Sequence, residues 1–154
     1  MIFKKKLFSI ILALFCNVFE LRLPMNKSID EIINFGKTTI QSELDNVADL
    51  INFIDETFAK VILLILESNG RVVITGIGKS AIIAQKIVAT LNSTGTPSIF
   101  MHAADAIHGD LGIIQKDDVV IAISKSGNTP EIKALAPLLK QFGNPLIAIV
   151  GNTD

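Results

Sequence analysis

The residues best suited to chemistry lie in three short loops, the first of which is part of VVITGIGKSA (72–81). In this loop Gly76 and Gly78 are followed at once by Lys79 and Ser80. A tight turn at the end of a strand, a helix N-terminus near Ser80 and one cation together favour an anion. The loop therefore predicts an anion site, and the alternative is a plain glycine-rich turn with a solvated lysine.

Two nucleotide-binding patterns fit this loop poorly. A Walker A loop that ends in GKS (78–80) needs its first glycine at position 73, where this chain has Val73. The dinucleotide pattern G-x-G-x-x-G/A is met by GIGKSA (76–81), but the next predicted strand ends in FMH (100–102) instead of an acidic residue. A nucleotide site is therefore disfavoured.

The second loop, SKSGNTPE (124–131), places hydroxyl groups in front of another predicted helix. Ser124, Ser126 and Thr129 can donate hydroxyls, and Pro130 suits the first turn of a helix whose N-terminus points at the same place. Hydroxyls and backbone N–H groups in this arrangement can hold a phosphate dianion without a metal. The alternative is an ordinary helix start capped by Ser or Thr.

The third segment, HAADAIHGDLG (102–112), contains both histidines of the chain and two aspartates. An imidazole beside a phosphate site can act as an acid or a base, because histidine titrates near neutral pH. We favour His108, since it precedes Gly109, where backbone can approach a ligand closely. We interpret His102 as a helix cap or a core residue.

The elements that must position these loops follow from the hydrophobic pattern. Four short apolar runs lack strict alternation and predict strands buried on both faces, at 71–76, 98–101, 118–124 and 145–150. Helices at about 79–93 and 130–142 separate them. This order predicts an α/β fold, a three-layer α-β-α sandwich with a parallel sheet, whose ligand sites lie at the carboxyl ends of the strands.

Two further helices precede the sheet in the sequence. SIDE (28–31) is a capping box that starts the first helix, and an apolar stripe with helical spacing runs over 29–54. The second helix, at about 55–67, carries the apolar run VILLIL and stops at NG (69–70). Its hydrophobicity predicts that it is buried between other elements.

Residues 1–24 stand apart as an apolar leader, with three lysines followed by the apolar run 7–19. Lysines before an apolar run are typical of a secretory signal or a membrane anchor. This run is short for a bilayer span, and no small-x-small cleavage site follows it. We favour a third interpretation, in which the chain starts at Met25 and the upstream codons are an over-extension.

The composition narrows the functional classes. The chain has 154 residues, 49% hydrophobic and 19% charged, with a net charge of −1, which suits one globular domain. The absence of Trp, of Tyr and of any basic block with aromatics disfavours nucleic-acid binding. Cys16, the single cysteine, excludes an internal disulfide, and the two histidines show no metal-ligand spacing.

Together the three loops resemble the sugar isomerase (SIS) domain family and, within it, the D-arabinose 5-phosphate isomerases. The S-x-S-G-x-T segment (124–129) is shared by many SIS domains, whereas STGTPS (93–98), a histidine and then HGDLG (108–112) are typical of these isomerases. The resemblance covers about residues 28–154. It implies interconversion of D-ribulose 5-phosphate and D-arabinose 5-phosphate through an enediol, in octulosonate and lipopolysaccharide biosynthesis.

The resemblance also implies which residues act. The catalytic positions would be Lys79, His108 and Glu131, with Lys79 suited to charge stabilisation and His108 to ring opening or proton transfer. The phosphate of the substrate would be bound by a second set of side chains, namely Ser80, Ser124, Lys125, Ser126 and Thr129. Neither a metal nor a cofactor is implied.

For the whole chain the resemblance implies one SIS domain over 25–154, with about four of its five strands and with its C-terminal part missing. CBS modules, present in many relatives, would also be absent. The expected partners are a pentose phosphate and further copies of the chain, as a homotetramer or dimer, in the cytoplasm, with neither nucleic acid nor membrane. Membrane anchoring or export would apply if 1–24 were a true signal. The alternatives are a non-catalytic phosphosugar-binding SIS domain and an inactive fragment.

Overall fold

A parallel sheet forms the centre of the computed structural model, which describes residues 2–3 and 28–152. Its main strands are β2 (Val72–Gly76), β3 (Ser98–His102), β4 (Val119–Ser124) and β5 (Leu146–Val150). The two-residue strand β1 (Ile2–Phe3) pairs with β5, so that the order is β1-β5-β4-β2-β3 with every pairing parallel. The four predicted strands and the parallel sheet are confirmed. The rest of the predicted leader lies outside the described residues.

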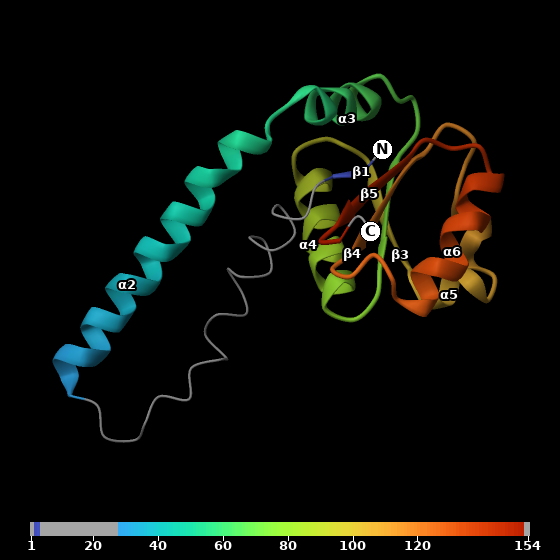
Figure 1. The fold of residues 1–154 in the computed structure, drawn as a ribbon. Coiled ribbons are helices and arrows are strands. Elements are labelled where there is room, and N and C mark those ends of the chain that lie inside the picture. The colour runs from blue at the N-terminus through green and yellow to red at the C-terminus, as the bar shows by residue number, and fades with distance from the viewer. Residues whose placement is uncertain (1, 4–27, 153–154) are drawn as a thin grey trace.

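Helices cover both faces of this sheet, which confirms the three-layer sandwich (Figure 1). On one face α3 (Glu56–Leu66) and α4 (Lys79–Ser93) pack against alternate strand residues such as Ile74. On the other face α5 (Ala103–Ile107) and α6 (Pro130–Gln141) pack against Val73 and its neighbours. The strands read as continuous apolar runs because each buries residues on both sides.

Two short helical elements between β3 and β4 were not predicted. They are α5 and the 3-10 helix η2 (Asp110–Ile113). Elements of five and four residues are too short for a 3.6-residue hydrophobic period to be visible. The segment 102–112 therefore reads as a loop in the sequence although much of it is helical.

The amino ends of the strands are held by a buried ion pair. Asp118, which is fully buried, accepts hydrogen bonds from the backbone N–H and Nη2 of Arg71, each at 2.8 Å, and from the backbone N–H of Gln115 at 2.8 Å. Burial alone would raise the pKa of Asp118, but the hydrogen bonds from the Arg71 side chain and from these N–H groups outweigh it and lower that pKa. The pair thus links the starts of β2 and β4.

Two further contacts strengthen the same end of the sheet. The Nδ2 of Asn144 donates to the carbonyl oxygens of Gln115 at 2.8 Å and Asp118 at 2.8 Å. Gly70 lies so close to the backbone of Asp117 that a Cβ at this position would overlap the Asp117 carbonyl. Only glycine therefore allows this approach between the two segments.

The N-terminal helical pair is confirmed, with one difference in its length. Its first helix is α2 (Ile29–Ala48), and the capping box forms as predicted, with the Ser28 N–H donating to Glu31 Oε2 at 2.8 Å and the Glu31 N–H donating to Ser28 Oγ at 3.3 Å. The α-helix ends at Ala48, and the stripe continues into the 3-10 helix η1 (Asp49–Phe53). In Figure 1, α2 projects away from the sheet.

The predicted burial of α3 is wrong. Val61 is its one buried residue among those described, while Ile62, Leu63 and Leu66 are exposed. The reason is that α3 lies at the margin of the sandwich, so that one side contacts the core and the described chain leaves the other side open (Figure 1). Of the helices that the structure describes, none combines the length and hydrophobicity that a membrane span requires.

Candidate functional site

The three loops singled out in the sequence begin at one edge of the sheet. In the strand register Gly76 of β2 lies opposite His102 of β3 on one side and Ile123 of β4 on the other. The chain runs from β2 to β3 and then crosses back to β4 on the opposite side of β2, which makes a topological switch point between β2 and β4. Open α/β sheets bind ligands just outside the carboxyl ends of the strands at such a point.

The first loop presents an open helix N-terminus to this edge. Gly78, at φ 56°, is the N-cap of α4, and within the described chain no side chain caps the helix there. A Cβ on Gly76 would lie 3.1 Å from the Ser80 carbonyl, so glycine lets the strand end and the helix approach each other. Lys79 is exposed and Ser80 is buried in the first helical turn. Uncapped N–H groups and a lysine together favour an anion.

The second loop is shaped by two of its own hydroxyls. Ser124 is buried, and its Oγ accepts a hydrogen bond from the Gly127 N–H at 3.1 Å. The Oγ of Ser126 accepts from the Asn128 N–H at 3.1 Å. Each hydroxyl keeps its own proton to donate, since both bonds use the oxygen as acceptor. Lys125, between them, is exposed.

Thr129 differs from these two serines because its hydroxyl is not used within the described chain. It occupies the N-cap position of α6, where its side chain makes no capping hydrogen bond. Its Oγ1 is buried and has no hydrogen-bond partner among the described residues. A buried hydroxyl of this kind normally has a partner, so its position at a helix N-terminus fits a ligand contact. Glu131 follows, half-buried, in the first turn of α6.

The third segment places its two histidines differently. His108 is exposed and ends α5, which packs against α6. His102 occupies the N-cap position of α5, in keeping with the cap interpretation, but its side chain makes no capping bond within the described chain. Instead its Nδ1 lies 3.5 Å from Asp105 Oδ2, and its ring meets the edge of Phe100 at 6.2 Å between centroids.

His102 thus lies at the carboxyl end of β3, opposite Gly76 of β2, and sequence reasoning gave it little weight. The available signal was Asp105, an acidic residue three positions later on the same helix face. The three predicted catalytic residues, Lys79, His108 and Glu131, come from different elements. Their assignment as a catalytic set remains a prediction. Among the residues that the structure describes, no group of three or more His, Cys, Asp or Glu side chains is placed to hold a metal ion.

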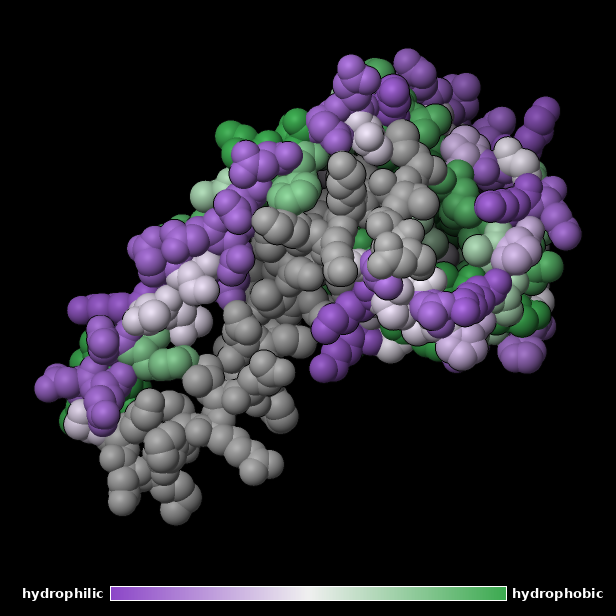
Figure 2. All heavy atoms as spheres, viewed as in Figure 1, coloured by the Kyte–Doolittle hydropathy of each residue, from purple (hydrophilic) through white to green (hydrophobic). Residues whose placement is uncertain are grey.

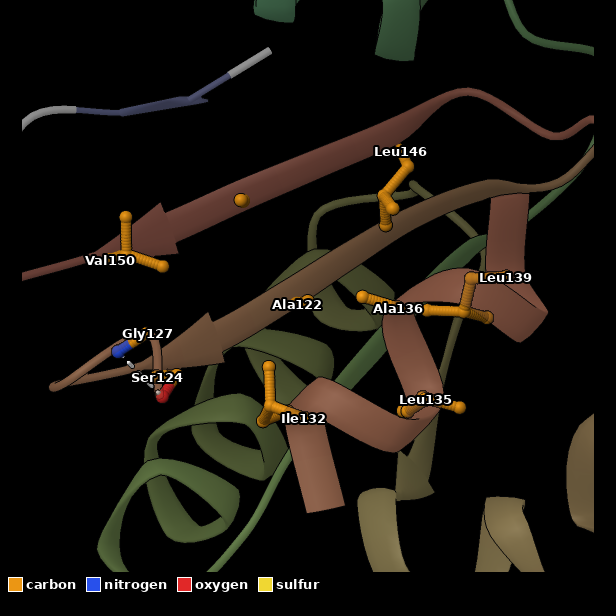
Figure 3. A pocket seen from close by; sticks show the side chains of 10 residues that line it. Ala122, Ser124, Gly127, Ile132, Leu135, Ala136, Leu139, Leu146 and Val150 are labelled. Atoms are coloured by element: carbon orange, nitrogen blue, oxygen red, sulfur yellow. Dashed lines mark hydrogen bonds between the residues drawn. The ribbon is translucent and has the colours of Figure 1, made fainter. Parts of the chain in front are cut away.

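A cavity of about 150 Å³ lies next to this edge, on the α6 face of β4 and β5 (Figure 3). Ser124 and Gly127 border it at one end, and the rest of its lining is apolar, including Leu139, Leu146 and Val150. A lining of this kind can hold an apolar group, but it offers too few polar contacts for a phosphate. The cavity is therefore a neighbour of the loop 124–131 and not the predicted phosphate site.

Comparison with known proteins identifies relatives of this chain. Residues 64–154 match the family model described as the SIS domain. Arabinose 5-phosphate isomerase KdsD of Pseudomonas aeruginosa is 48% identical over 132 residues, which are 86% of this chain and 40% of that protein. Its namesake from Escherichia coli K12 is 44% identical over 119 residues, which are 77% of this chain and 36% of that protein. The chain thus spans between 36% and 40% of the length of these curated relatives.

Solved structures agree with these relatives. An Escherichia coli CFT073 protein in complex with arabinose 5-phosphate superimposes with a TM-score of 0.74 at 46% identity, covering 80% of this chain and 66% of that one. A protein from Listeria monocytogenes gives a TM-score of 0.77 at 35% identity, covering 84% of this chain and 68% of that one.

Proposed function

Because the chain belongs to the SIS domain family, we propose that it interconverts D-ribulose 5-phosphate and D-arabinose 5-phosphate as an aldose–ketose isomerase. The names of its curated relatives and the arabinose 5-phosphate complex of a structural neighbour support this substrate. The observation that carries the proposal is that the three loops follow the carboxyl ends of three neighbouring strands, β4, β2 and β3, with the switch point between β2 and β4. Two loops suited to an anion and a segment with two histidines therefore start from one end of the sheet, which supports a sugar-phosphate site there.

The substrate phosphate is held by the first two loops in this proposal. The uncapped N-terminus of α4 and the buried Ser80 contribute from one side. Ser124, Ser126 and Thr129 contribute hydroxyl protons from the other side, with Lys125 as the nearby cation. Backbone N–H groups at two helix N-termini add to these contacts.

The reaction itself needs one proton to move between two carbons. From the ketose, a base removes a C1 proton while the C2 carbonyl oxygen gains a proton, which gives the enediol. A proton is then added at C2 while the O1 hydroxyl loses its proton, and C1 becomes the aldehyde. His108 or Glu131 would carry the proton, and Lys79 would stabilise the developing negative charge on oxygen.

The same proposal places the chain in its cellular setting. It supplies D-arabinose 5-phosphate for octulosonate and lipopolysaccharide biosynthesis, and it works in the cytoplasm, where pentose phosphates are found. It also assembles with copies of itself, as the resemblance implies. These three statements rest on the family relationship and on the substrate.

Binding and turnover test the proposal separately. Isothermal titration with D-arabinose 5-phosphate measures binding, and proton NMR of D-ribulose 5-phosphate measures turnover. We expect both in the full chain. His108→Gln should lower kcat by about 100-fold or more while Kd changes little, because proton transfer contributes at this scale. Gln115→Glu, on an exposed residue at the opposite end of the sheet, is the control that should leave kcat unchanged.

The outcomes distinguish the alternatives. Tight phosphosugar binding without turnover would favour a non-catalytic binding domain. Failure to bind either pentose phosphate would contradict the proposed substrate. Unchanged kcat in the His108 variant would remove this residue from the reaction and leave the substrate assignment intact.

A further inference from the structure

The outer edge of β5 depends on β1 for its cover. Among the described strands, β1 alone lies on that side of β5. The five residues of β5, LIAIV, include no charge and no proline, which are the residues that usually protect an open edge from pairing with another chain. Hydrophilic side chains cover much of the sandwich surface in Figure 2, but none of them belongs to β5. The edge therefore needs a covering strand.

The first residues of the chain supply this strand. The two residues of β1 pair with Ala148 and Ile149 in the parallel direction, as in every other pairing of the sheet. They are an isoleucine and a phenylalanine, which are residue types that favour strands. Cleavage of a secretory signal would remove β1, and a chain that started at Met25 would lack it. The strand therefore exists only in a protein that keeps its first residues.

The carboxyl end of β5 holds the loop 124–131, which is proposed to bind the substrate phosphate. Gly151 follows β5 directly, and its N–H donates to the carbonyl oxygen of Lys125 at 3.0 Å. Gly127, at φ 67°, lies so close to the same segment that a Cβ there would be 3.0 Å from the carbonyl oxygen of Asn152. The position of the loop backbone therefore depends on where the end of β5 lies.

We propose that β1 is a lasting part of the folded protein and that it positions the loop 124–131 by holding β5. The residues that pair with β1 lie within three positions of Gly151, so that β1 fixes the part of β5 that contacts the loop. A strand bonded on both sides opens less readily than an edge strand. The inference rests on the phosphate site of the proposed function, and it differs from the start at Met25 that the sequence pattern favoured.

Hydrogen bonds at the two ends of β5 indicate which of its amides face β1. The N–H of Val120 in β4 donates to the carbonyl oxygen of Pro145, just before β5, at 2.9 Å, and the Gly151 N–H donates back to the end of β4 at 3.3 Å. Successive residues of a strand direct their backbone groups to opposite neighbours. The N–H of Ile149 therefore faces β4, and the N–H of Ala148 faces β1.

Hydrogen exchange followed by NMR in the full chain tests this pairing. Ile2→Pro combined with Phe3→Pro removes the N–H groups that β1 needs for pairing. We expect the Ala148 N–H to exchange about tenfold faster or more, while the Ile149 N–H keeps its rate. Ile2→Val combined with Phe3→Val retains both N–H groups and is the matched control, in which neither rate should change.

Titration with inorganic phosphate, followed at the Gly127 amide signal, tests the effect on the loop. The proline variant should bind phosphate about threefold more weakly or worse, and the valine variant should bind like the wild type. The KM for D-ribulose 5-phosphate should rise by the same factor in the proline variant, while kcat changes little. Partial unfolding would instead lower kcat, so this comparison separates positioning from loss of the fold.

The mature chain itself provides a third measurement, the intact mass of the protein made from its natural reading frame. We expect this mass to include the residues of β1. A mature chain that begins at Met25 would overturn the inference, as would equal exchange of the Ala148 N–H in the proline and valine variants.

The remaining outcomes separate this inference from the proposed function. Faster exchange at Ala148 with unchanged phosphate affinity would show that β1 does not position the loop. A wild type that binds no phosphate would contradict both the phosphate site and the positioning of its loop, whereas the exchange rates would still decide the pairing of β1 with β5. Phosphate binding without isomerase turnover would leave the inference intact and contradict the proposed reaction.

Discussion

At the scale of single residues, the hydroxyl of Thr129 is a group whose role can be isolated. It is buried and without a hydrogen-bond partner in the described ranges, although it stands at the N-terminus of α6. Replacing it by a methyl group therefore breaks no hydrogen bond that the structure shows. Any effect on ligand binding would come from the missing ligand contact.

We predict that Thr129→Val weakens binding of D-arabinose 5-phosphate by about tenfold or more, since a hydrogen bond to a charged group contributes roughly 1.5–3 kcal/mol. The free energy of unfolding should not fall, because the replaced hydroxyl makes no hydrogen bond within the described residues. Isothermal titration and urea unfolding measure the two quantities.

Thr75→Val is the matched control for Thr129→Val. The Thr75 hydroxyl is also buried and unpartnered among the residues described, but Thr75 is fully buried inside β2. Its replacement should raise the free energy of unfolding by about 1 kcal/mol, because an unsatisfied buried hydroxyl is removed. Phosphosugar affinity should not change. Equal binding losses in both variants would contradict a specific contact by Thr129.

The sequence predicted which residue types occur in the candidate site, but not which of their polar groups are already hydrogen-bonded within the chain. Hydroxyls and a proline before a helix pointed to the loop 124–131, and the structure shows an open helix start there. Whether a hydroxyl is free or already bonded depends on loop geometry, so the sequence could not separate Thr129 from Ser124. The position of His102 beside Asp105 depends likewise on where β3 ends and α5 begins.

At the scale of elements, the pair of Arg71 and Asp118 joins the starts of two central strands. Because its hydrogen bonds lower the pKa of Asp118, the ionised carboxylate stabilises the folded state. This contribution is fully present above the ordinary carboxyl pKa of about 4. It is lost as pH falls from there through the lower pKa of the folded protein.

We predict that Asp118→Asn lowers the free energy of unfolding at pH 7 by about 3 kcal/mol, because Arg71 then loses its buried partner. The difference between variant and wild type should shrink as pH falls below about 4. Urea unfolding at several pH values measures it. Asp117→Asn, at the exposed neighbouring position, is the control. A difference that stays constant with pH would show that charge at Asp118 is not the cause.

The close approach of Gly70 to the strand connection gives a second prediction at this scale. Gly70→Ala should lower the free energy of unfolding by about 2 kcal/mol, because the new Cβ would overlap the backbone of Asp117 and one segment must move. Gly112→Ala is the control, since no described atom lies within 4 Å of a Cβ there. Thermal or urea unfolding compares them, and equal stability of both variants would contradict the close approach.

Most elements could be predicted from local patterns, because buried parallel strands and capped helices leave clear signals. The boundaries of α4 and the capping box of α2 are of this kind. The burial of α3 could not be predicted, since a hydrophobic run does not say whether its cover belongs to the same chain. The short α5 was missed because a five-residue helix has too few turns to show a period.

At the scale of the whole molecule, the strand order decides where a ligand can bind. The four predicted strands indicated a parallel sheet but not which of them would be neighbours. The order β5-β4-β2-β3 puts β2 between the strands that carry the other two loops. The switch point beside β2 is thus a property of the assembled sheet, and this explains why three loops that are far apart in sequence share one edge.

The hydrogen bonds around Asp118 have a consequence for how this protein can evolve. Arg71, Asp118 and Asn144 stabilise the amino ends of the strands, whereas the loops with Ser124, Thr129 and His108 follow the carboxyl ends. Mutations in the loops that we propose to bind the substrate therefore lie at the opposite end of the strands from these stabilising contacts. Substitutions in these loops should therefore cost little stability, so that the same fold can acquire a preference for different phosphosugars.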